Sequence, residues 1–156
     1  MHISAQGRNK ISKKELKYLT RFVGELLLGK RLSNNVHVTI ISQDFVTNTW
    51  GICSPMDFDY KNHREFEILL NRKISKKKQL ITLCHELVHL KQYARNELRD
   101  TDRKGILWLG KQYSISEKFN LKEYLSRPWE AEANQKETVL YEEYKKHIKE
   151  NGIKFQ

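Results

Sequence analysis

Two histidines and a glutamate in the segment His85-Glu-Leu-Val-His89 form an H-E-x-x-H pattern. Residues four apart lie one turn above each other on a helix, so both imidazoles can bind one metal ion. Glu86 is rotated by about 100° from His85 around the axis, and its carboxylate can therefore reach a water at the metal without coordinating it. We expect His85 and His89 to bind Zn²⁺ and Glu86 to accept the proton of that water.

A hydrolytic zinc site needs a third protein ligand and one open position. The extended pattern that adds a Gly and a third His is absent, because neither residue stands at the required positions after His89. A carboxylate is the better candidate, and two occur in the segment Arg127-Pro-Trp-Glu-Ala-Glu-Ala-Asn134. Glu130 is preferred, since Asn134 lies one turn further along its face and can hydrogen-bond a ligand histidine. Glu132, which points about 200° away on a helix, is the alternative.

Two long helices must bring these groups together. The stretch from about Ser75 to Leu98 contains the H-E-x-x-H pattern and predicts a helix, because apolar residues recur along one side and no Gly or Pro intervenes. A last helix is expected to open at Pro128, where the missing N–H costs nothing, and to run to about Asn151 before Gly152. The fold class is therefore α+β, with a C-terminal helix that delivers the glutamate.

The N-terminal half predicts one helix and a small, mostly antiparallel sheet. The helix runs from a capping box at Ser12 to Gly29. Residues 99–126 are irregular, apart from a short hairpin around Ile106–Leu109 and Tyr113. Three branched or alternating segments predict the strands Val36–Ile41, Thr47–Cys53 and Glu65–Asn71.

The composition bounds the remaining possibilities. A chain of 156 residues and 18.6 kDa fits a single domain over residues 1–156. No apolar run approaches the ~18 residues that cross a bilayer, so no membrane partner is expected. The N-terminus lacks the apolar region of a secretory signal, and the two cysteines are too few to staple the chain. These features predict a cytoplasmic protein.

The residues also carry a resemblance. His85-Glu-Leu-Val-His89 followed by Leu-Lys-Gln-Tyr93, with the later segment Arg127–Ala133, resembles the zincin metallopeptidases. The closest likeness is to the small HExxH proteins of phages and bacteria that are grouped with SprT-like peptidases. The spacing from Glu130 to Asn134 is similar to the gluzincin arrangement, in which a glutamate on a second helix completes the site. This chain departs by having Asn where that group has Asp, and it lacks the third histidine of SprT proper.

The resemblance implies a minimal zincin-like domain that hydrolyses peptide bonds with zinc and a glutamate general base. It also implies that an edge strand beside the active helix aligns an extended protein or peptide substrate, and Glu65–Asn71 is the expected strand. A donor must stabilise the charge on the carbonyl oxygen. The candidates, among which the sequence does not choose, are Tyr93, Tyr113, Tyr124 and Arg127.

Two other functions remain open. The net charge is +10 and the isoelectric point is about 9.6, so the chain can be a nucleic-acid-associated binding protein with a structural metal. Alternatively, it can be a non-catalytic zincin-like interaction protein. The basic residues cluster in two runs, which are Arg8, Lys10, Lys13, Lys14, Lys17, Arg21, Lys30 and Arg31, and Arg72, Lys73, Lys76, Lys77 and Lys78.

Overall fold

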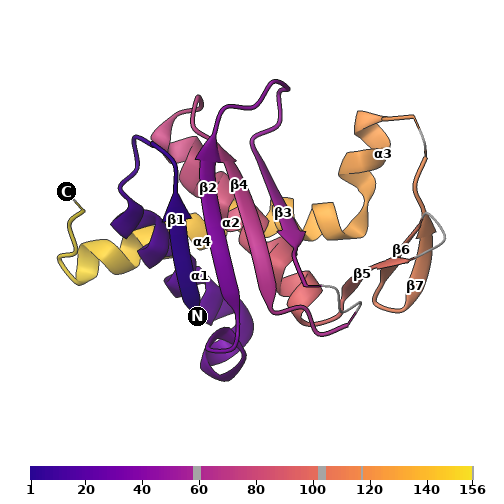
Figure 1. Ribbon diagram of the computed structural model, residues 1–156, viewed down its shortest axis with the longest axis horizontal. Helices are drawn as coiled ribbons and strands as arrows, with labels where there is room; N and C mark the ends of the chain where they lie inside the picture. Colours follow the sequence, from indigo (N-terminus) through magenta and orange to yellow (C-terminus); the bar gives the residue numbers. More distant parts are fainter. Residues whose placement is uncertain (58–60, 102–104, 117, 156) are drawn as a thin grey trace.

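The computed structural model describes residues 1–57, 61–101, 105–116 and 118–155. These residues form an α+β fold with a four-stranded sheet, a three-stranded sheet and four helices (Figure 1). The helices are α1 (Lys13–Ser33), α2 (Lys76–Ala94), α3 (Leu121–Ser126) and α4 (Pro128–Glu150). The strands are β1 (His2–Gln6), β2 (His37–Gln43), β3 (Gly51–Pro55), β4 (Glu65–Asn71), β5 (Leu98–Thr101), β6 (Gly105–Trp108) and β7 (Lys111–Ser114).

The larger sheet has the strand order β1-β2-β4-β3 and is mostly parallel. β1 and β2 pair in parallel, as do β2 and β4, and only β3 is antiparallel to its neighbour. The prediction of a mostly antiparallel sheet is therefore wrong. The sequence analysis missed β1, and with that strand α1 becomes the crossover that a parallel pair requires.

The edge strand beside α2 also differs from the prediction. β4 lies inside the sheet, because it pairs with β2 on one side and with β3 on the other. The strand at that edge is β3, whose predicted range of Thr47–Cys53 began earlier and ended earlier than the observed one. Any peptide that adds to the sheet beside α2 would therefore pair with β3.

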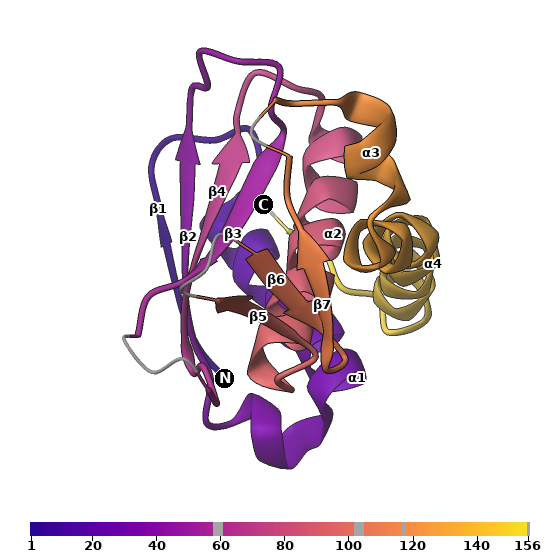
Figure 2. The same ribbon diagram turned by 90° about the vertical axis from the view of Figure 1, so that its right-hand side faces the viewer.

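The core lies between the larger sheet and the helices α1 and α2, and α4 packs on the far side of α2. Figure 2 shows this order, with the sheet at the left, α2 in the middle and α4 at the right. Alternate residues of β2 and β4 point into the core, which fits the two-residue period of a strand. The buried core side chains include Val38, Ile40, Phe66, Ile68 and Leu70 from the sheet and Leu16, Leu19, Val23, Leu80, Leu83 and Leu87 from the helices.

The helix predictions hold with small changes at their ends. Ser12 caps α1 and accepts a hydrogen bond from the Glu15 N–H at 3.1 Å. α1 does not stop at Gly29, whose φ of 73° interrupts the helix before it resumes to Ser33. α2 ends at Ala94, earlier than predicted, because Asn96 turns the chain with a φ of 58° into β5.

The segment between α2 and α4 contains more structure than predicted. The expected hairpin is present, since Ile106 pairs with Tyr113 across β6 and β7. β5 extends it to a three-stranded sheet. The helix α3 was not predicted, and Asn120 caps it by accepting a hydrogen bond from the Glu123 N–H. None of the helices in the described residues has both the length and the apolar character needed to cross a bilayer.

Candidate metal centre

α2 places His85 and His89 on one face, one turn apart. The helix begins at Ser75, whose hydroxyl caps the Lys78 N–H, and its apolar residues pack into the core. The Nε2 atoms of His85 and His89 lie 3.1 Å apart. The His89 side chain is buried, and His85 lies at the edge of the same buried site.

α4 brings Glu130 to the two rings. Pro128 opens this helix, and Ala133, which is fully buried, allows it to pack closely against α2. The Glu130 carboxylate spans the pair, with Oε1 at 3.4 Å from Nε2 of His89 and Oε2 at 3.4 Å from Nε2 of His85. One ligand atom from each of the three residues lies within 4.8 Å of the others, so this group has the geometry to hold a metal ion.

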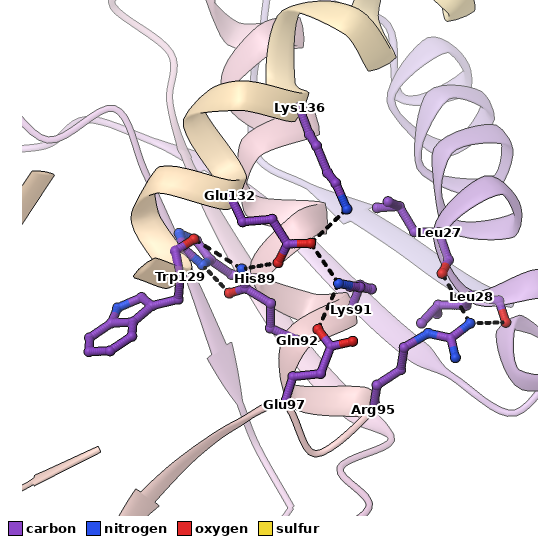
Figure 3. A network of polar contacts seen from close by, with 10 residues as sticks. All are labelled: Leu27, Leu28, His89, Lys91, Gln92, Arg95, Glu97, Trp129, Glu132 and Lys136. Carbon is purple, nitrogen blue, oxygen red and sulfur yellow. Dashed lines mark hydrogen bonds and ion pairs between the residues drawn. The ribbon is translucent and has the colours of Figure 1, made fainter. Parts of the chain in front are cut away.

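Glu132 points toward Lys91, Gln92 and Lys136, as Figure 3 shows. Its Oε1 accepts from Lys91 at 2.8 Å and from Lys136 at 2.6 Å, and its Oε2 accepts from Gln92 at 2.8 Å. Burial disfavours its charge, but these donors outweigh it and lower the pKa of Glu132 to about 2. Of the two candidate carboxylates, only Glu130 faces both rings.

The other nitrogen of each ring is held by an oxygen from the protein. Nδ1 of His85 lies 2.8 Å from Oε2 of Glu137, and Nδ1 of His89 lies 2.9 Å from Oε1 of Gln92. The amide nitrogen of Gln92 donates to Glu132 and to the Trp129 carbonyl, so Oε1 is left to accept. Each neutral ring therefore carries its proton on Nδ1 and directs the lone pair of Nε2 toward Glu130.

The supporting contact to His85 comes from the expected face of α4 but from the next turn of the helix. Asn134 was expected to bond a ligand histidine, but it is exposed and the contact to His85 comes from Glu137. Both residues follow Glu130 along one face, at four and seven positions. The ring of His85 contacts Glu137, whose side chain is longer than that of Asn134 and is charged. Gln92 was also missed, although it stands three positions after His89, where side chains on a helix meet.

The charges at this site favour a cation between the rings. Burial opposes the charged form of His85, but contacts with Glu130 and Glu137 outweigh it and raise the pKa of the imidazole to about 10. Burial likewise opposes the charge of Glu130, but the two histidines lower its pKa to about 2. Oε2 of Glu130 is buried without a hydrogen-bond partner among the described residues. Two nitrogen lone pairs and a carboxylate are donors that fit Zn²⁺.

Glu86 lies on the side of α2 that faces β3. Its side chain is buried, and burial raises the pKa of this carboxyl, with His89 and His85 opposing the shift only in part. Gly51 makes this position possible, because a β-carbon there would lie 2.8 Å from Oε1 of Glu86 and 2.7 Å from Cγ2 of Thr82. A carboxylate with a raised pKa is a better base at neutral pH.

Two cavities adjoin this site, and among the four candidate donors Tyr124 is the one that lines both, together with Glu86 and Glu130. Burial and the charge of Glu130 raise the pKa of its hydroxyl. Tyr93 lines only the smaller cavity, and Tyr113 packs edge-on against Trp129. Arg127 pairs with Glu123 at 3.5 Å.

The remaining histidines and Cys84 lie outside this cluster. His37 stacks on His2, His63 lies 2.6 Å from Asp57, and His147 contacts the Tyr18 hydroxyl at 2.9 Å. Cys84 is fully buried in the core, and burial raises the pKa of its thiol.

Comparison of the chain with protein-family models, with curated proteins and with solved structures found no match.

Proposed function

We propose that this protein is a zinc-dependent metallopeptidase with a minimal zincin-like domain. The observation that carries the proposal is the convergence of the two Nε2 lone pairs, fixed by Glu137 and Gln92, on the buried carboxylate of Glu130. His85, His89 and Glu130 would hold the ion. When bound, Zn²⁺ acidifies a water and polarises a substrate carbonyl.

The chain's own residues supply the other functions. Glu86 accepts a proton from the attacking water and passes it to the leaving amine, because it is buried beside the ligands and its pKa is raised. Tyr124 donates a hydrogen bond to the carbonyl oxygen, where negative charge develops. The tyrosine lines both cavities next to Glu86 and Glu130, which supports this role.

The proposal includes a cytoplasmic setting, which two unpaired cysteines support. The alternative of a structural metal is less well supported. A structural zinc site is closed by four protein ligands, whereas the group in the described residues contains three. In the second basic run, Arg72 pairs with Asp44 and Lys76 pairs with Glu15, each at 2.6 Å, so part of the positive charge of that run is already neutralised within the protein.

Metal analysis and a cleavage assay test the proposal together. We expect Glu130→Ala to lose zinc and Glu132→Ala to retain it. Glu86→Gln should keep zinc while cleavage of an unfolded protein falls by about 10²- to 10⁴-fold. If Glu132→Ala lost zinc and Glu130→Ala retained it, Glu132 rather than Glu130 would be the third ligand. Full cleavage by Glu86→Gln would overturn the mechanism, and salt-sensitive DNA binding without cleavage would favour the structural-metal alternative.

A further inference from the structure

Two cavities meet at the candidate site and follow β3. The larger, of about 710 Å³, lies between the start of β3 and α3 on the His85 side. The smaller, of about 210 Å³, lies toward β5 and β6 on the His89 side. Both are lined by Gly51, Glu86, Tyr124 and Glu130. A molecule bound along β3 would therefore pass the candidate ligands with one part in each cavity.

The side of β3 that faces these cavities offers backbone groups. β3 is bonded to β4 through Trp50 O, which accepts from the Asn71 N–H, and through the Met56 N–H, which donates to Glu65 O. Alternate residues of an antiparallel strand bond to the same neighbour, so Gly51 and Cys53 direct their backbone groups away from β4. The Cys53 N–H is directed at the Glu86 carboxylate, so the Gly51 groups and the Cys53 carbonyl are the ones open to a ligand. Among the described strands, β3 has a neighbour on one side only. An extended peptide can hydrogen-bond to this edge.

The wall of the larger cavity is apolar and open to solvent. Large apolar side chains that lie half-exposed or more gather there from both sides of the groove, and a cluster of this kind is a mark of a binding surface. Trp50 immediately precedes β3, Leu121 and Leu125 belong to α3, and Phe119 lies two residues before α3. The exposed fractions are 49% for Trp50, 77% for Phe119, 60% for Leu121 and 49% for Leu125.

Three carboxylates, of Glu86, Glu130 and Glu137, line the larger cavity beside His85. The nearby cation is Lys78, whose Nζ lies 3.3 Å from the centroid of the Trp50 ring. A substrate carboxylate placed there would meet like charges in a partly buried site, which disfavours binding. An apolar side chain would instead bury itself against α3 and the edge of Trp50, whose ring also carries Lys78. The apolar wall and the three carboxylates therefore favour the same class of residue.

We propose that the groove binds an extended peptide along the free edge of β3 and selects a large aliphatic or aromatic side chain, which enters between Trp50 and α3. The smaller cavity, walled by Ile52, Leu98, Ile106 and Trp129, takes a smaller apolar residue on the other side of the cleaved bond. This inference rests on the proposed function for the cleavage step. Binding of the peptide does not depend on that step and can be measured separately.

The cleavage test uses zinc-loaded protein and internally quenched octapeptides of Gly, Ser and Ala that carry one Phe, Leu, Asp or Lys. We expect kcat/KM for the Phe or Leu peptide to exceed that for the Asp peptide by at least about tenfold, with cleavage beside the apolar residue. Leu125→Asp should lower this preference by about tenfold and leave the zinc content unchanged. Phe119→Ser should lower it in the same direction if the first variant folds poorly.

Val139→Asp is the matched control, since Val139 is 57% exposed on α4 and does not line the groove. It should retain the wild-type preference. The binding test uses Glu86→Gln and the same peptides with a fluorescent label, followed by anisotropy. Tighter binding of the Phe peptide without cleavage by the wild type would uphold the groove and refute the peptidase. Cleavage with equal rates for Phe and Asp peptides, or equal loss in Val139→Asp, would refute the groove and leave the peptidase standing.

Discussion

Gly51 of β3 lies so close to Glu86 of α2 that a β-carbon at position 51 would stand 2.8 Å from the carboxylate oxygen Oε1. The contact joins the edge strand to the helix that carries the histidines. A side chain at position 51 would displace either the strand or the carboxylate. The proposed base therefore depends on the absence of a side chain across from it.

We predict that Gly51→Ala lowers kcat by about 10²-fold, because a displacement of Glu86 by about an ångström is enough for such a loss. Zinc content should not change, since Glu86 is not a ligand in the proposed site. Gly24→Ala is the control, because its β-carbon would meet only the flexible end of Met1. Steady-state kinetics with metal analysis measures the effect, and an unchanged kcat in Gly51→Ala would contradict the positioning of Glu86.

Glu137 should contribute to zinc affinity and Asn134 should not. Glu137→Ala removes the oxygen that holds Nδ1 of His85, and loss of such a contact typically weakens metal binding by about 10- to 100-fold. Asn134→Ala, one turn earlier on the same face, should bind zinc as the wild type does. Competition with a chromogenic chelator measures both affinities. A larger loss in Asn134→Ala than in Glu137→Ala would reverse the assignment.

Gln92 should stabilise the fold as well as the site. Its side chain is fully buried and bonds His89, Glu132 and the Trp129 carbonyl. Gln92→Leu keeps the volume but removes all three bonds, so we expect a loss of about 1–3 kcal/mol in the free energy of unfolding. Urea unfolding of the metal-free protein measures it. Equal stability of the two proteins would show that these bonds are not needed.

Asp57 gives a pH dependence that is separate from the metal. Burial opposes its charge, but the Arg64 N–H and His63 outweigh this and lower the pKa of Asp57 below its usual value. A lowered folded pKa means that the stabilisation is complete above the pKa of the unfolded chain and is lost as the pH falls through the folded value. Wild type and Asp57→Asn should therefore differ in unfolding free energy at pH 6 and converge toward pH 3. A difference that grows on acidification would contradict the assignment.

The relative position of the two histidines could be predicted from the sequence, but the residues that hold their rings could not. Spacing alone placed His85 and His89 on one helix face, because helix geometry fixes residues four apart. The rotation of α4 against α2 brings Glu130 to the two histidines and Glu132 to Lys91 and Gln92, and helix spacing alone does not fix that rotation. Glu137 and Gln92 were missed, because their contacts depend on side-chain length and on packing between distant segments.

The sheet was misjudged for a similar reason. The short segment His2–Gln6 has no strong strand pattern, and its pairing with β2 depends on α1 folding back between them. Without β1, three strands in sequence order suggest a meander. β4 lies between β2 and β3 in the sheet. This order depends on contacts between distant segments, so local sequence patterns do not predict it.

The buried amide of Gln92 joins α2 to the first turn of α4 at two points, the Trp129 carbonyl and the Glu132 carboxylate. The same side chain orients the ring of His89. Metal binding and the packing of α4 against α2 would therefore be thermodynamically coupled. The metal ligands concerned are His85, His89 and Glu130. Chelation should loosen residues 128–150 before the β1–β2–β4 core responds, so amide exchange in α4 would report metal occupancy.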